Sequence, residues 1–155
     1  MEQTNLKIRK TSEKDITFLY ELINGLASYE KRPNDMTASI EDLECMLFKR
    51  HMATAVIAEN NEGNPLGYAI YYPIFSSFSG KAKVYIEDLF IKPEYRHQGL
   101  GKEFFYQLSN LIKDEEYIEM EWSCLDWNAS SIEFYKKIGA IQEKGRAYFG
   151  YKLNS

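Results

Sequence analysis

The sequence predicts a mixed α/β fold, in which a central, mostly antiparallel sheet contains one parallel pair of strands. A strand-like segment at 82–91 precedes an apolar pattern of helical spacing over 100–112, and a second strand-like segment follows at 117–125. A strand, a crossover helix and a strand place the two strands parallel in one sheet. Two β-rich segments, 53–58 and 66–72, flank a turn-forming cluster rich in Asn and Gly, and they predict an antiparallel hairpin.

The first third of the chain predicts a strand and two helices. Residues 6–10 form the expected first strand, and Ser12 in the following Thr-Ser-Glu stretch can cap a helix that carries apolar residues from Ile16 to Leu26. After a loop at 31–35, the sequence from Ser39 to Asp42 resembles a capping box. It predicts a second, short helix that extends to about Phe48.

Turn-forming residues and apolar alternation predict the remaining elements. The serine-rich segment 73–80 predicts a loop before the central strand. Strict alternation along 117–125 places Cys124 on the core-facing side. Asn128, Ser130 or Ser131 can cap a last helix that ends near Gly139, and closing strands are expected at 141–143 and 147–153.

The central strand changes its phase, and this change predicts a β-bulge. Val84 and Ile86 are apolar at even positions, whereas Leu89 and Ile91 are apolar at odd positions. Because strand side chains alternate between faces, one extra residue must lie between the two pairs, near Glu87–Asp88–Leu89. A bulge leaves main-chain N–H groups unpaired, so they are free to bind a ligand.

A glycine-rich motif, R-x-x-G-x-G at Arg96–Gly101, leads into the helix after the central strand. Glycines at a helix start let the backbone approach a ligand closely, and the first N–H groups of a helix favour an anion such as phosphate. An ordinary strand–loop–helix turn also uses Gly and Pro, so the motif by itself leaves both interpretations open.

Composition excludes several classes of function. The 155 residues are 45% hydrophobic and 27% charged, as in an ordinary globular protein, and they are expected to form one domain over 1–155. The net charge is -4 with no basic run, which argues against nucleic acid as a partner. Two cysteines and two histidines argue against a disulfide framework or a metal site. The sequence has no apolar run of membrane length, so a cytoplasmic protein with no membrane partner is expected.

Four segments together resemble a known family. They are IRKTSEKDI with LINGLASYE (8–30), GYAIYY (67–72), YIEDLFI with YRHQGLG (85–101), and WNASSIEFYKKIGA (127–140). They resemble the GNAT superfamily of N-acetyltransferases, and within it the diamine (spermidine/spermine) and thialysine acetyltransferase branch. The resemblance spans nearly the whole chain, and it implies the GNAT fold: a twisted mixed sheet whose parallel pair splays at the bulge, with helices on both faces.

The resemblance implies acetyl-coenzyme A as cofactor, coenzyme A as product, a small-molecule amine as substrate, and a homodimer. It makes Glu87 the base that removes the ammonium proton through water, and Tyr135 the acid that protonates the leaving thiolate. Glu87 also belongs to the implied amine site, together with Tyr29, Glu30 and Asp88. The implied cofactor-binding residues are Leu89, Phe90, Ile91, Arg96, His97, Gln98, Gly99, Leu100, Gly101, Lys102, Asn128, Ser130 and Ser131.

The chemistry of amide formation needs these residue types. A protonated amine must lose a proton before it attacks, a carbonyl oxygen that gains charge needs a fixed donor, and a departing thiolate needs an acid. Without the resemblance, Tyr135 would be read as a core tyrosine and Glu87 as an ordinary strand carboxylate.

Two departures from the polyamine branch leave the acceptor open. Ser76 and Ser77 stand where polyamine acetyltransferases carry an acidic residue, and Ala129 replaces a glutamate. A smaller amine or a thialysine-like side chain is therefore an alternative to a polyamine. A protein amine as acceptor, and a coenzyme A-binding module without catalysis, are the competing hypotheses.

Overall fold

A computed structural model of the chain describes residues 5–154, and the sheet in this part has five strands in the order β1-β2-β3-β4-β5. The first three neighbouring pairs are antiparallel, and β4 and β5 are parallel. The predicted mixed sheet with one parallel pair is thus confirmed. The strands are β1 (Lys7–Lys10), β2 (Thr54–Glu59), β3 (Pro65–Ser76), β4 (Lys81–Ile91) and β5 (Met120–Trp122).

Among the α-helices that the structure describes, two begin at a side-chain cap, supplied by Ser39 and by Asn128. The helices are α1 (Ile16–Tyr29), α2 (Ile40–Glu44), α3 (Leu100–Asp114) and α4 (Ala129–Lys137). At the start of α2 the Asp42 N–H donates to Ser39 Oγ at 3.0 Å, and the Ser39 N–H donates to Asp42 Oδ2 at 2.8 Å. This reciprocal pair satisfies two N–H groups that have no partner within the helix, and it confirms the predicted capping box.

The chain falls into two compact units, one that extends through Ser123 and one that begins at Cys124. The first unit contains the sheet and α1 to α3, and the second contains α4 and the C-terminal segment (residues 141–154). A single domain over 1–155 stays a prediction. Within residues 5–154, none of the helices combines the length and the apolar composition needed to cross a bilayer.

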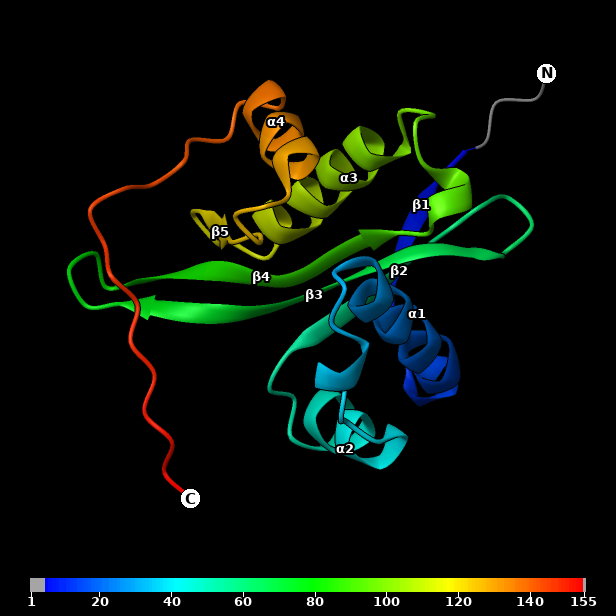
Figure 1. The fold of residues 1–155 in the computed structure, drawn as a ribbon, viewed down its shortest axis with the longest axis horizontal. Helices are drawn as coiled ribbons and strands as arrows, with labels where there is room; N and C mark the ends of the chain where they lie inside the picture. Colours follow the sequence, from blue (N-terminus) through cyan, green and yellow to red (C-terminus); the bar gives the residue numbers. More distant parts are fainter. Residues whose placement is uncertain (1–4, 155) are drawn as a thin grey trace. The chain divides into compact units, whose positions relative to one another are not determined.

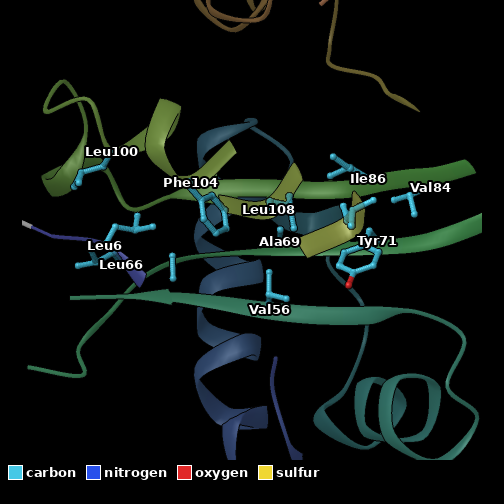
Figure 2. Close-up of a cluster of buried hydrophobic side chains, with 12 residues drawn as sticks. Leu6, Val56, Leu66, Ala69, Tyr71, Val84, Ile86, Leu100, Phe104 and Leu108 are labelled. Carbon is cyan, nitrogen blue, oxygen red and sulfur yellow. The ribbon is translucent and has the colours of Figure 1, made fainter. Parts of the chain in front are cut away.

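Two apolar clusters hold the first unit together, one on each face of the sheet. On one face, Phe104 and Leu108 of α3 pack against strand residues such as Val56 and Val84 (Figure 2). On the other face, α1 covers a cluster that includes Tyr68 and Phe90 (Figure 1). Each large apolar side chain fully removed from water contributes about 1.5–3 kcal/mol, so both layers stabilise the sheet. Helices therefore cover both faces, as expected.

The bulge lies at Glu87, in the stretch where the phase change predicts it. Ile70 of β3 is paired with Asp88, but the next residue, Tyr71, is paired with Ile86. Glu87 is thus the extra residue of β4. Beyond it, Leu89 returns to the face of Val84 and Ile86 and packs against the same apolar cluster.

The parallel pair is short and ends at the bulge. β5 pairs with Val84, Tyr85 and Ile86, and the recorded pairing stops one residue before Glu87. β3 continues along the other edge of β4 as far as Ile91. In the described part of the chain, the β5-side edge of β4 from 87 to 91 is therefore not covered by β5.

The structure corrects the predicted hairpin and the strand after α3. β3 continues through Pro73 to Ser76 instead of ending at 72, because these residues pair with 81–84 and only 77–80 form the turn. The strand predicted over 117–125 is reduced to β5, because pairing stops where β4 bulges away. Cys124 lies beyond that short strand and is exposed, so its predicted position in the core is wrong.

The two closing strands predicted at 141–143 and 147–153 are also wrong. Within the described residues, no strand is assigned after β5. An alternating sequence becomes a strand only where a neighbouring backbone completes its ladder of hydrogen bonds. The C-terminal segment has the side-chain pattern of a strand without this pairing, and its Tyr148 and Phe149 are more than nine-tenths exposed.

Gly67 keeps β3 against the end of β4, and we expect Gly67→Ala to lower the free energy of unfolding by at least about 2 kcal/mol. A Cβ at this position would collide with the carbonyl oxygen of Phe90 and come within 3.1 Å of Ile91 Cα, and neither backbone atom can rotate away. Urea denaturation measures the loss.

Gly150→Ala is the matched control for this substitution. Among the described residues, a Cβ at Gly150 meets no atom within 4 Å. Equal stabilities of the two alanine variants would show that the β3–β4 contact is looser than described.

Candidate active site

The bulge places two consecutive carboxylates on one face of the sheet. Tyr68 and Tyr72 lie four residues apart on β3 and therefore point to the same face. The Tyr68 hydroxyl donates to Asp88 Oδ2 at 2.9 Å, and the Tyr72 hydroxyl donates to Glu87 Oε2 at 3.2 Å. In a regular strand, neighbours such as Glu87 and Asp88 would point to opposite faces. The extra residue thus creates an acidic pair on the face that α1 covers.

Burial makes Asp88 electrostatically unusual, whereas the neighbouring Glu87 is exposed. Removal from water raises the pKa of Asp88 to about 6; the Tyr68 hydrogen bond opposes this shift, and the negative charges of Glu87 and Glu30 add to it. Burial and the nearby Asp88 hold the pKa of Tyr68 well above its usual range. The pKa of Tyr72 rises to about 12, first through burial and then through Glu87. Glu30 follows the last residue of α1, so α1 adds a third carboxylate to this region. The region favours a cation.

Tyr68 and Tyr72 are site residues that the sequence analysis missed. The alternation in Gly67–Tyr72 places Tyr68, Ile70 and Tyr72 on one face, and this signal was available. The missing information was the register, because Ile70 lies opposite Asp88 and only this pairing brings the two phenols to the carboxylates.

We expect Asp88→Asn to raise the free energy of unfolding at pH 7.5. At acidic pH this gain in stability should disappear. The folded-state pKa of Asp88, about 6, lies above that of an unfolded aspartate. The folded protein thus keeps the proton longer, and Asp88 lowers stability as pH rises between about 4 and 6. The substitution should add roughly 1–3 kcal/mol at pH 7.5.

Urea unfolding at pH 7.5 and at pH 4 tests this expectation. At pH 4 both side chains are neutral, and the two proteins should differ little. Asp126→Asn changes an exposed aspartate and serves as the control. A lower stability of Asp88→Asn at pH 7.5 would contradict the proposed cost of the buried charge.

The loop before α3 contains two residues with positive φ and leads into a helix N-terminus, and both features favour an anion. His97 and Gly99 both have left-handed backbones, with φ of 62° and 76°, and they lie immediately before the first turn of α3. Alternation of left-handed residues with their neighbours turns successive N–H groups to one side, and a 15-residue helix begins there. His97 is exposed, whereas Leu100 is buried and anchors the helix start. Lys102 is exposed in the first turn, with Nζ 5.9 Å from the Tyr106 ring centroid.

Arg96 connects this loop to the end of α1. Its Nε donates to the carbonyl oxygen of Ile91 at 2.9 Å, and its guanidinium carbon lies 4.0 Å from the centre of the Tyr29 ring. Arg96 and Phe90 are also neighbours, at 5.3 Å from Cζ to the ring centroid. The structure thus brings together Tyr29, the end of β4 and the start of the glycine-rich loop.

Four predicted residues lie in the second unit: Asn128, Ser130, Ser131 and Tyr135. Asn128 is buried and caps α4, because its Oδ1 accepts the Ser131 N–H at 3.2 Å. Ser130 lies in the first turn of α4, and Tyr135 lies five residues further along, with its ring centroid 5.6 Å from that of Phe134. Of the three candidate caps predicted for α4, the structure shows Asn128 in this role. The roles of Tyr135, Asn128 and the two serines stay predictions.

A sequence profile described as the Acetyltransferase (GNAT) family matches residues 16–140 of this chain. The chain belongs to the GNAT acetyltransferase family. This GNAT enzyme is 32% identical over 141 residues to thialysine N-epsilon-acetyltransferase of Sus scrofa, which covers 86% of this chain and 82% of the relative. It is 29% identical over 151 residues to the human spermidine/spermine N(1)-acetyltransferase-like protein 1, which covers 91% of this chain and 22% of that protein.

A solved structure supports the fold of this GNAT enzyme. The crystal structure of an aminoglycoside acetyltransferase from an uncultured soil metagenomic sample, in complex with sisomicin, superposes with a TM-score of 0.80. The comparison covers 96% of this chain and 97% of the other, at 20% sequence identity. The resemblance found in the sequence motifs is therefore confirmed at the level of family and fold.

Proposed function

We propose that this GNAT enzyme transfers an acetyl group from acetyl-coenzyme A to the primary amine of a small molecule. The observation that carries the proposal is the pair Glu87 and Asp88, brought to one face by the bulge and close to Glu30. An alkyl ammonium ion is cationic at neutral pH, so a partly buried acidic region beside the edge of β4 suits its recognition.

The features of the first unit fit acetyl-coenzyme A. The loop at 96–102 offers backbone N–H groups for the diphosphate. It contains the left-handed residues His97 and Gly99 and leads into the N-terminus of α3. The β4 segment 89–91, beyond the end of β5 pairing, offers backbone groups for the pantetheine arm. Asn128, Ser130 and Ser131 are the further residues proposed to line this site. The cofactor supplies an acetyl group activated as a thioester.

The residues of the chain are assigned three tasks. Asp88 and Glu30, together with Tyr29, bind and orient the ammonium group. Glu87 accepts a proton from the amine through water, which frees the nitrogen lone pair for direct attack. Tyr135 donates its hydroxyl proton to the departing sulfur. Because attack is direct, much of the acceleration comes from holding the two reactants together.

The acceptor class is proposed from the charge of the region and from the relatives. One relative is named for thialysine and another for spermidine or spermine, and all of these are small amines. Ser76 and Ser77 lie at the end of β3 and the start of the turn, where an acidic residue would add a second contact for a long polycation. We therefore propose a thialysine-like amine or a diamine as acceptor, with a protein amine as the alternative.

An amine panel tests this proposal. Release of free thiol from acetyl-coenzyme A is measured with spermidine, spermine, putrescine, thialysine, lysine, ornithine and a lysine-containing peptide. We expect at least one small amine to accelerate thiol release strongly over the amine-free rate. Acceleration by the peptide alone would indicate a protein acetyltransferase. No acceleration, with coenzyme A still bound in calorimetry, would support a binding module.

We also propose a homodimer located in the cytoplasm. Large apolar side chains of the C-terminal segment are exposed, among them Tyr151 at 90% and Leu153 at 91%. A second copy could remove them from water, which is the usual fate of such patches. Light scattering of the purified protein would measure the mass, and a monomer at micromolar concentration would contradict the dimer.

A further inference from the structure

Arg96 directs its side chain inward, toward β4 and α1. It follows a short turn, Pro93–Tyr95, that begins two residues after β4 ends. Its Nε donates to Ile91 O, and its guanidinium faces the rings of Tyr29 and Phe90. One side chain thus contacts the last residue of α1, the end of β4, and the loop that leads to α3.

This contact uses properties that only arginine combines. A planar guanidinium can lie over an aromatic face while an N–H in its plane donates to a carbonyl. The ammonium of lysine is a compact, strongly hydrated charge, and it cannot keep a planar stack on Tyr29 while it binds Ile91 O. Arg96 is half-buried in this arrangement, as is Tyr29.

We propose that Arg96 is a positioning residue that couples the cofactor loop (residues 96–102) to the acceptor end of α1 at Tyr29 and Glu30. This inference rests on the proposed function for the identity of the two sites. The backbone of the loop holds the cofactor, and the Arg96 side chain transmits the position of the loop to Tyr29. Coenzyme A that orders the loop therefore also orders the end of α1, and by linkage each ligand improves the binding of the other.

The coupling predicts a particular pattern of kinetic defects. Loss of the Arg96 side chain should displace Tyr29 and weaken use of the amine, while the N–H groups of the loop still bind coenzyme A. With thialysine as acceptor, we expect Arg96→Gln to lower kcat/KM for the amine about ten-fold and to change the Kd of coenzyme A far less. Arg96→Lys should behave like Arg96→Gln, because charge alone does not restore the stack.

A double-mutant cycle with Tyr29 isolates the contact. We expect Tyr29→Leu to cause a defect similar to that of Arg96→Gln, and the double variant to be no worse than either single variant. Tyr29→Phe keeps the ring face that Arg96 contacts, so a cycle built on this variant should still show coupling between Arg96 and position 29. Arg50→Gln makes the same change at an exposed arginine outside this cluster, and it is the control.

Hydrogen exchange supplies a readout that does not depend on catalysis. Coenzyme A should slow amide exchange at 28–32 in the wild-type protein, and this protection should be lost in Arg96→Lys. If the amine panel fails, this measurement still decides whether the coupling exists. Strictly additive single-mutant defects would overturn the proposal. A ten-fold weaker Kd for coenzyme A in Arg96→Gln, with unchanged amine kinetics, would also overturn it and make Arg96 a phosphate ligand.

Discussion

Replacement of Glu87 by glutamine is expected to lower kcat at pH 7 by roughly 10²–10³-fold. Glutamine keeps the size of the side chain and can still contact the Tyr72 hydroxyl, but it cannot accept a proton. The variant must instead capture the small fraction of amine that is already neutral in solution. An alkyl amine has a pKa near 10, so this fraction grows about ten-fold for each pH unit between 7 and 10.

The pH profile separates loss of the base from loss of structure. In Glu87→Gln, kcat/KM should climb steeply from pH 7 to pH 10, toward the wild-type value. A variant with a damaged site would instead stay slow at every pH. Glu62→Gln is the control, because Glu62 lies in the exposed turn between β2 and β3. If Glu87→Gln kept more than half of the wild-type kcat at pH 7, Glu87 would not be the base.

Tyr135→Phe is expected to lower kcat by about 10²-fold or more, while the Kd of coenzyme A changes little. Phenylalanine preserves the ring and its edge contact with Phe134, so α4 should keep its packing. The substitution removes the hydroxyl proton that would neutralise the departing sulfur. Steady-state kinetics with the best amine of the panel, and calorimetry with coenzyme A, measure the two quantities.

This substitution also distinguishes an enzyme from a binding module. Tyr20→Phe removes the hydroxyl of a half-buried tyrosine on α1 and should have little effect on kcat. A Tyr135→Phe variant that turns over like Tyr20→Phe would remove Tyr135 from the mechanism. In that case the acid would have to be water or another group, although the family assignment would stand.

The sequence predicted those features that depend on local rules. The alternation of Val84 and Ile86 conflicts with that of Leu89 and Ile91, and a strand can resolve this conflict only with an extra residue. The capping box at Ser39 is likewise a local signal. Both were confirmed in the structure, because the physical constraint acts within a few residues.

Features that depend on distant partners could not be predicted. The extension of β3 to Ser76 and the shortness of β5 are set by which backbone lies alongside, and sequence alternation does not report this. The same holds for the inward position of Arg96, because a motif specifies the residue type but not the aromatic rings it meets. The roles of Glu87 and Tyr135 came from the resemblance alone, and the experiments above decide them.

The bulge residue in β4 also determines where insertions and deletions can be tolerated in this chain. Removal of Leu89 would allow a regular ladder between β3 and β4, in which Asp88 would turn toward α3 while Glu87 stayed on the α1 face. The carboxylates would then separate to opposite sides of the sheet. An added or lost residue in the exposed turn 77–80 moves none of these groups, so we expect length variation to be tolerated there.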